Sequence, residues 1–358
     1  MKRIYNFSAG PAILPVPVLE EASKAVLEIA GSGMSILEVS HRSKVYETLH
    51  QEARANLLKV MGLKPEDYTV LFLGGGASQQ FATIPMNFLK PGSTADYVDG
   101  GEWGNKAIKE AKGLGTVNVA ASSAAVKHAT LPTDYKWTPG AAYAHLTTNN
   151  TIEGTQMRVP PATAAPLILD ASSDFLSHRL DWGKAALIYA GAQKNAGPAG
   201  VTIIVIKKSF LATGRTDIPA IFQYAVHDKA DSLYNTPPVF PIYVFGLVLK
   251  WIESQGGLEA IEKRNYRKAQ VIYDVLDAHA DVYDAAVTKK EDRSWMNITW
   301  RVRDASKEEA FLKGAKDRNM DGLKGHRNVG GFRASVYNAF PEEGCVALAE
   351  YLKEFAKQ

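Results

Sequence analysis

From about residue 68, short apolar runs alternate along the chain with stretches of helical periodicity. Each apolar run has the length of a buried strand, and the stretches between several of them can form helices. Strands that alternate with helices predict an α/β domain with a largely parallel sheet. The predicted strands are Tyr68–Leu73, Ala95–Val98, Ala142–Leu146, Pro166–Leu169, Ala185–Tyr189 and Val201–Ile206.

Apolar residues recur at helical spacing in four segments of the chain, and two of these segments precede residue 68. The segment near 239–255 is so apolar that its helix should be buried. Before the first helix, the stretch from Ser8 to Pro15 is rich in glycine and proline, which predicts an ordered loop. The predicted helices are Val18–Ala30, Val45–Met61, Ser78–Leu89 and residues 239–255.

After residue 260 the pattern changes to charged helices separated by isolated strands. This change predicts a smaller α+β domain, and we place the boundary near residue 260. The large domain would span 16–260, and the small domain would combine 1–15 with 261–358. The predicted elements are a helix at Glu259–Ala278, a strand at Trp295–Val302, a helix at 306–318, a strand at Phe332–Val336 and a helix at 341–356.

Composition narrows the class of protein. The net charge of +3 suits small anionic substrates and is too weak to indicate nucleic acid. The single cysteine, Cys345, rules out an internal disulfide, and no Cys/His cluster has metal-ligand spacing, so we expect no metal. With neither a signal-like N-terminus nor a run of ~20 apolar residues, we expect a cytoplasmic protein without membrane contact.

A glycine loop follows the first predicted strand, at Gly74–Gly76, and opens the next helix at Ala77 and Ser78. Backbone N–H groups at a helix N-terminus suit a phosphate, and glycine lets the ligand approach closely. The dinucleotide fingerprint fails because Gln79 replaces its third glycine, and the Walker A pattern is absent. A plain tight turn remains the alternative when the loop is taken alone.

Two residues near strand ends could form a catalytic pair. Asp170 ends an apolar strand, and Lys194 follows the next strand within Gln193-Lys194-Asn195, among alanines and glycines. A lysine in such surroundings is poorly placed for solvent, and burial would make its amine nucleophilic. Pyridoxal phosphate (PLP) needs a lysine for a Schiff base and an acid at its ring nitrogen. A helix cap or turn remains the alternative for Asp170.

Basic residues cluster in two places, at His41 and Arg42 and again at His326, Arg327 and Arg333. Arginine forks suit carboxylate and phosphate groups. An ordinary salt-bridged surface is the alternative for either cluster. The other histidines have no partner at diagnostic spacing and are expected to be structural or solvated, and Cys345 is expected to fill space in a terminal helix.

Taken together, these segments resemble the phosphoserine aminotransferase family over essentially the whole chain. The most specific matches surround Lys194 and Arg333, and the residues after Ser177 depart from the family's usual pattern without touching an assigned role. The matching motifs are NFSAGPAILP, EVSHRS, GGGASQQF, EWG, NNTIEG, DASSDFLS, YAGAQKNAGPAGVT, NTPP and GHRNVGGFRASVYNA.

The resemblance implies a PLP-dependent transferase of fold type I, in the class-V branch, and a role for each matching residue. Lys194 would bind PLP covalently and Asp170 would pair with its ring nitrogen, so these two would be catalytic. The remaining cofactor contacts would be Ala77, Ser78, Trp103, Thr151, Gln193, Asn235 and Thr236, the last two from the other subunit of a homodimer. Substrate contacts would be Ser8, His41, Arg42, His326, Arg327 and Arg333.

The implied reaction moves an amino group between L-glutamate and 3-phosphohydroxypyruvate, giving O-phospho-L-serine and 2-oxoglutarate. The longer phosphorylated keto acid of vitamin B6 synthesis is a further possible acceptor. Three alternatives stay open: another class-V enzyme such as a cysteine desulfurase or an alanine–glyoxylate aminotransferase, a nicotinamide oxidoreductase, and a catalytically silent relative. Cys345 lies in a helical pattern, which disfavours the desulfurase.

Overall fold

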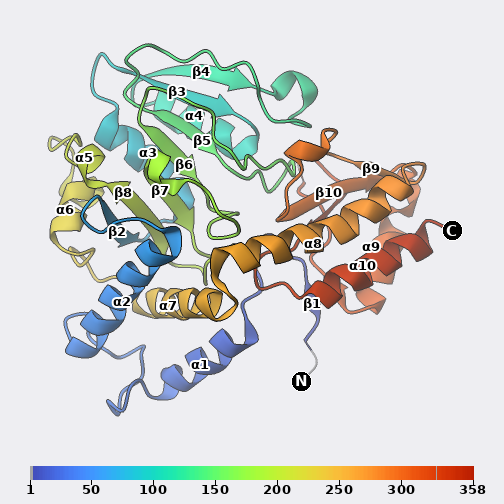
Figure 1. Cartoon of the computed structure of the whole chain (residues 1–358), viewed down its shortest axis with the longest axis horizontal. Helices are drawn as coiled ribbons and strands as arrows, with labels where there is room; N and C mark the ends of the chain where they lie inside the picture. Colours follow the sequence, from blue (N-terminus) through green and yellow to red (C-terminus); the bar gives the residue numbers. More distant parts are fainter. Residues whose placement is uncertain (1–2, 328) are drawn as a thin grey trace.

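A computed structural model describes residues 3–327 and 329–358, and its largest sheet has seven strands, in the upper left of Figure 1. The strand order is β2-β8-β7-β6-β5-β3-β4. The pairs from β7 to β4 are parallel, whereas β8 is antiparallel to both of its neighbours. The predicted, largely parallel sheet is therefore confirmed. Its strands are β2 (Tyr68–Leu73), β3 (Thr94–Asp99), β4 (Thr116–Ser122), β5 (Ala144–Thr147), β6 (Leu167–Asp170), β7 (Ala185–Gly191) and β8 (Thr202–Lys207).

Helices cover both faces of this sheet. On one face, α3 (Gly76–Phe88) and α4 (Glu102–Lys112) bury apolar side chains against the strands. On the other face lie α1 (Val16–Leu27), α2 (Lys44–Met61) and α7 (Val239–Ser254), in a second apolar core. The predicted apolar helix near 239–255 is thus buried, as expected from its composition.

The C-terminal third of the chain builds a separate apolar core with the first residues of the chain. Strand β10 (Asn297–Val302) is central between β12 (Phe332–Ser335) and β9 (Tyr283–Ala285), and β1 (Tyr5–Asn6) pairs with β11 (Met320–Asp321). These strands pack with α8 (Gly257–Ala278), α9 (Glu308–Asp317) and α10 (Glu342–Phe355), on the right of Figure 1. Helix α8 runs without a break through residue 260, so the division of the chain at that residue stays a prediction.

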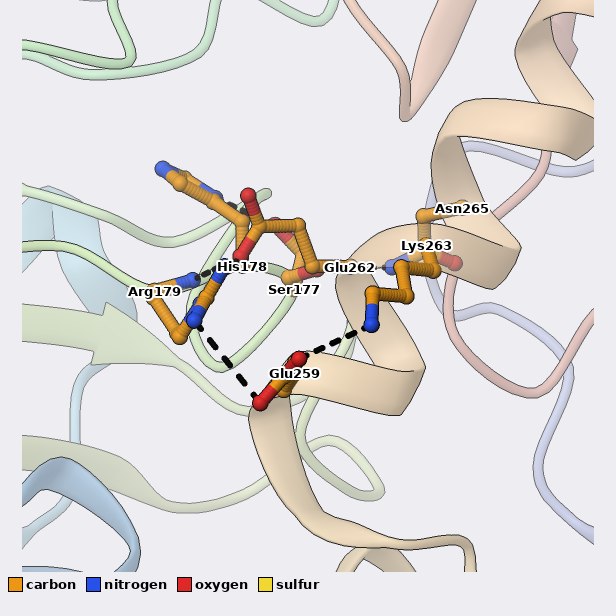
Figure 2. A network of polar contacts seen from close by, with 7 residues as sticks. All are labelled: Ser177, His178, Arg179, Glu259, Glu262, Lys263 and Asn265. Atoms are coloured by element: carbon orange, nitrogen blue, oxygen red, sulfur yellow. Dashed lines mark hydrogen bonds and ion pairs between the residues drawn. The ribbon is translucent and has the colours of Figure 1, made fainter.

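A polar network fastens the loop after β6 to the start of α8 (Figure 2). Arg179 contacts Glu262 at 2.9 Å and Glu259 at 3.8 Å, while the Asn265 amide donates to the Ser177 carbonyl at 2.9 Å. The network joins the loop after β6, which belongs to the large sheet, to α8, which packs in the C-terminal core. In the part of the chain that the structure describes, no helix is long and apolar enough to cross a membrane.

Candidate active site

Asp170 and Lys194 lie where two neighbouring parallel strands end. Asp170 is the last residue of β6, and Lys194 sits in the turn after β7. Carboxyl ends of parallel strands share one edge of a sheet, which is where α/β folds bind ligands. Asp170 is 4% exposed, and its carboxylate accepts hydrogen bonds from Ser172, from the backbone at 3.0 Å and the hydroxyl at 2.6 Å. The structure therefore places the predicted pair at one edge.

Burial and charge act against each other on both members of this pair. Burial raises the pKa of Asp170, while Lys194 and Ser172 favour its charged form. Burial lowers the pKa of Lys194, and Asp170 opposes that change, whereas Arg333 adds to it. A lysine whose charged form is disfavoured reaches its neutral, nucleophilic form more easily.

Asparagines that the sequence analysis did not single out hold the loop that carries Lys194. Asn195 donates to the Phe175 carbonyl at 2.6 Å and accepts from the backbone N–H of Asn338 at 2.8 Å. The Asn338 side chain in turn accepts from Asn265 of α8 at 2.7 Å. All three asparagines are buried, so the lysine loop is tied to the C-terminal core through hydrogen bonds shielded from water.

Trp103, Thr151 and Arg333 form a connected set beside the lysine. The Trp103 indole N–H donates to the Thr151 hydroxyl at 2.8 Å, and Arg333 donates to the Thr151 carbonyl at 2.9 Å. The Lys194 amine lies 4.9 Å from the centre of the Trp103 ring. Because the Thr151 oxygen accepts from Trp103, its own proton remains available for another acceptor.

The glycine loop forms an uncapped helix start. Gly75 and Gly76 have φ angles of 82° and 67°, and a Cβ on Gly75 would lie 1.6 Å from the Gln79 side chain. No side chain caps the N-terminus of α3, so its first N–H groups are available to a ligand. Ala77 is half-buried and Ser78 exposed at this end.

Strand pairing brings the glycine loop close to the lysine loop. Thr202 at the start of β8 contacts the Gly74 carbonyl at 3.4 Å, and it pairs with Gly191, the last residue of β7. Gln193 follows two residues later, and its carbonyl accepts from Ala12 of the N-terminal segment at 2.9 Å. The predicted phosphate contacts at Ala77, Ser78 and Gln193 therefore converge from two loops at the same edge of the sheet.

Asn235 and Thr236 are exposed. Asn235 lines a cavity of about 210 Å³ with Gly74, Gly75 and Gln79 of its own chain. The two prolines that follow, Pro237 and Pro238, line the same cavity.

Arg333 and His326 line a larger cavity of about 690 Å³, to which residues of α4 and of the C-terminal core contribute. Burial lowers the pKa of His326, and the charges of Arg333 and Arg327 lower it further. Among the described residues, Nε of Arg333 is buried without a hydrogen-bond partner. A buried guanidinium N–H with no partner is costly, so Arg333 is ready to bind an anion. Ser8 follows β1 and is half-buried beside Gly322, and it is not among the residues that line this cavity.

His41 and Arg42 do not line that cavity. They lie in the segment between α1 and α2, on the left of Figure 1, whereas the C-terminal core is on the right. Arg42 is exposed and His41 half-buried. The structure thus separates these two predicted substrate contacts from Arg333 within one chain.

The arrangement fits PLP. Lys194 supplies the amine, Asp170 supplies a buried acid, the uncapped start of α3 can bind a phosphate, and Trp103 can cover an aromatic ring. At Gly75, the positive φ angle and the neighbouring Gln79 side chain both favour glycine.

The family model for class-V aminotransferases matches residues 4–348, so the chain belongs to that family. It is a PLP-dependent transaminase of the expected α/β fold. A phosphoserine aminotransferase from Bacillus subtilis (strain 168) is 48% identical over all of this chain and 99% of its own.

Two solved structures agree. A phosphoserine aminotransferase from Bacillus circulans subsp. alkalophilus superposes with a TM-score of 0.97 at 48% identity, over 100% of this chain and 99% of that one. A PLP-bound phosphoserine aminotransferase from Trichomonas vaginalis gives 0.93 at 38% identity, over 98% and 100%. Within the class-V enzymes, the chain is therefore a member of the phosphoserine aminotransferase family.

Proposed function

We propose that this chain transfers the amino group of L-glutamate to 3-phosphohydroxypyruvate, giving O-phospho-L-serine and 2-oxoglutarate, in a reversible ping-pong reaction. The observation that carries the proposal is Arg333. It is bound to Thr151 beside the Lys194–Asp170 pair, with a buried Nε ready for a carboxylate. A transaminase needs this combination of an amine, an acid and an anion site at one point.

Each residue near the pair has a defined task in this proposal. PLP, when bound, supplies an electron sink for the substrate's α-carbon. Lys194 would hold the cofactor, and its free amine would remove and return protons at carbon. Asp170 would keep the ring nitrogen protonated, Trp103 would cover the ring, and Thr151 would donate its free proton to the ring's phenolic oxygen.

The substrate's two anions are bound by different arginines. Arg333 makes a bidentate contact with the α-carboxylate, as its fork geometry allows. His326 and Arg327 bind the second anion, which is a γ-carboxylate in glutamate and a phosphate in the other substrate. Burial lowers the pKa of His326, and the charges of Arg333 and Arg327 lower it further, so both arginines act at the position of His326.

We further propose a homodimer with shared active sites. His41 and Arg42 do not line the cavity of Arg333 in their own chain, so they would act in the partner's site. The family resemblance implies the same role for Asn235 and Thr236, and Asn235 also borders the glycine loop of its own chain. An apolar patch on α1 and the following segment could form the subunit contact, because large exposed apolar areas commonly mark interfaces. Its members are Val16, Leu19, Val26, Leu27, Met34 and Leu37.

The sulfur chemistry of a cysteine desulfurase finds no support. Cys345 is fully buried in α10, and burial raises its pKa to about 12. A buried thiol with such a pKa is a poor nucleophile. The vitamin B6 keto acid remains a possible second acceptor, since the cavity beside Arg333 has a volume of about 690 Å³.

The test is substrate discrimination by the purified, PLP-loaded protein. O-phosphoserine, serine and alanine are supplied at equal concentration with 2-oxoglutarate as acceptor, and glutamate formation is followed. We expect O-phosphoserine to be used at least ~100-fold faster, because unpaired buried cations penalise a substrate without the second anion. Equal use of serine or alanine would refute the phosphoserine assignment while leaving a transaminase.

A further inference from the structure

Three neighbouring strands place one polar residue each on the same face of the large sheet. Asp170 of β6 is directly paired with Tyr189 of β7, and His145 of β5 is paired with Ile168 of β6. Side chains two residues apart on a strand share a face, so Ile168 and Asp170 lie on one side with both partners. The face is the one covered by α3 and α4, and Tyr189 and His145 are both buried there.

Tyr189 lies between the other two residues and interacts with both. Its hydroxyl is 2.9 Å from Nε2 of His145, and its interaction with the Asp170 carboxyl opposes the rise that burial causes in the pKa of that carboxyl. Burial raises the pKa of Tyr189 well above its usual value, so the hydroxyl keeps its proton. Burial lowers the pKa of His145 to about 3, so the imidazole is neutral and carries one N–H.

The Tyr189 hydroxyl has one proton and therefore can donate to one partner at a time. If it donates to His145, the Asp170 carboxylate loses a donor, and the imidazole proton must sit on Nδ1, to which no other described residue hydrogen-bonds. If His145 instead carries its proton on Nε2, it donates to the Tyr189 oxygen, and the tyrosine proton is directed to the carboxylate. The second arrangement forms a charge-assisted bond, which is the stronger kind.

We infer that Tyr189 and His145 are positioning residues for Asp170, with His145 donating from Nε2 to Tyr189 and Tyr189 donating to the carboxylate. Neither residue touches the reacting atoms. Together with Ser172, they fix the direction of the carboxylate and stabilise its negative charge in a buried site. The inference rests on the proposed role of Asp170 as partner of the cofactor's ring nitrogen.

The line formed by His145, Tyr189 and Asp170 has a measurable consequence at the cofactor. A carboxylate that has lost a donor takes a proton from the ring nitrogen more readily, which weakens the electron sink. Less positive charge on the ring then lets the nitrogen that joins Lys194 to the cofactor keep its proton to higher pH. The other charged or titratable groups felt by Asp170 and Lys194, namely Arg333 and Asp174, remain in place in the variants below.

The experiment compares Tyr189→Phe, His145→Leu, the double variant and His145→Gln, all loaded with PLP. We expect Tyr189→Phe to lower kcat ~10-fold with little change in KM, from the loss of one hydrogen bond to a charged group. The pH midpoint of the visible absorption band should rise, and PLP should dissociate more easily. His145→Leu should shift all three in the same direction by less. The Gln variant, whose amide can still donate to Tyr189, should recover most of the loss.

The double variant and a matched control make the test decisive. If the line acts as one unit, His145→Leu should have almost no further effect in the Tyr189→Phe background. Tyr97→Phe is the matched control, because Tyr97 stacks on His145 but its hydroxyl binds Tyr143. It should lower the melting temperature without moving the absorption midpoint.

Multiplying effects in the double variant, or an unmoved midpoint in Tyr189→Phe, would overturn the inference. If Tyr189→Phe fails to fold, the contrast between His145→Leu and His145→Gln decides the question by itself. Asp170→Asn separates this result from the larger proposal. Full activity in that variant would remove Asp170 from the proposed function, whereas a crippled Asp170→Asn beside unaffected Tyr189 and His145 variants would remove the positioning line alone.

Discussion

The two ends of the active site are built in opposite ways. Around Lys194 and Asp170, one chain supplies a buried acid, an uncapped helix start and several layers of hydrogen bonds. Around the second anion, Arg42 and Arg327 are exposed, and His41 and Arg42 lie away from the cavity that Arg333 lines. The amine and the acid of the chemical end come from one chain, whereas in the proposed homodimer the selective end would draw on both.

This difference teaches where rigidity is needed. Proton transfer at carbon requires groups held within a fraction of an ångström, which buried networks achieve. Recognition of either a carboxylate or a phosphate at one site requires cations that can adjust, and exposed arginines on separate segments can do so. We therefore expect substitutions at the two ends to change different kinetic constants.

The largest effect should come from Lys194→Ala. Loss of the amine removes both the covalent link and the proton carrier, so turnover should fall by ~10⁴-fold. Lys194→Arg, which keeps the charge but not the nucleophile, should be as poor. Borohydride reduction followed by peptide mapping should label the Lys194 peptide in the unaltered protein. A label on a different lysine would contradict the assignment.

Asp170→Asn should follow, with a loss in kcat of ~100-fold or more, because a charge-assisted partner of the ring nitrogen is removed. The matched control is Asp174→Asn. Asp174 is also buried, and burial raises its pKa to about 7, but it accepts from Thr148 and Gln156. Stopped-flow half-reactions should show the control within ~3-fold of the unaltered protein. Equal losses in both variants would mean that a general defect of the core is being measured.

At the selective end, Arg42→Ala and Arg327→Ala should each raise KM for O-phosphoserine by ~10-fold or more, with the cofactor spectrum unchanged. The control is Arg303→Ala, an exposed arginine 3.8 Å from Asp284. Initial rates across substrate concentration give both constants. A fall in kcat alone for the two test variants would contradict the expectation that substitutions at the two ends of the site change different kinetic constants.

Mixed dimers sharpen the same comparison. Co-expression of Lys194→Ala and Arg42→Ala chains should give dimers in which one site carries both defects and the other carries neither. Activity should then recover to a fraction of the unaltered level, up to about half per mixed dimer. Absence of any recovery in dimers shown to be mixed by mass spectrometry would place Arg42 in its own chain's site.

The smallest effect on turnover should come from Lys268→Met in the C-terminal core. Lys268 is fully buried, donates to the carbonyls of Val336, Tyr337 and Phe340, and has a pKa lowered by burial to about 7. An unfolded lysine holds its proton to about pH 10, so the native state binds fewer protons between about pH 7 and 10. The free energy of unfolding should rise with pH across this window, and urea titrations should show a smaller rise in the variant.

Local pattern was enough to predict most elements. Each predicted strand forms with small shifts at its ends, and α2, α7 and α8 lie close to their expected positions. Helix α4 was missed, although Gly104, Ala107, Ile108 and Ala111 are buried at intervals of three or four. Its first residues, Glu-Trp-Gly, were interpreted only as a motif shared with the family, and no helix was predicted there. Strand β4 was missed because, at the edge of the sheet, most of its residues are exposed or half-exposed.

The site divides in the same manner. Asp170 and Lys194 could be predicted because each stands directly after an apolar strand. Asn195, Asn338, Tyr189 and His145 could not, because their partners depend on strand register and on contacts between segments more than 40 residues apart. A buried histidine without a nearby partner in sequence gives no sign of the hydrogen bond it makes in space.

The pairing of β1 with β11 imposes an order on folding during synthesis. Tyr5 pairs with Met320, so the first strand made has to wait for one of the last. The residues of the large sheet lie between them, from 68 to 207, and can associate while the ribosome is still translating the C-terminal core. A ribosome stalled before residue 320 should therefore display a protease-resistant sheet preceded by an N-terminal segment that is still cleavable.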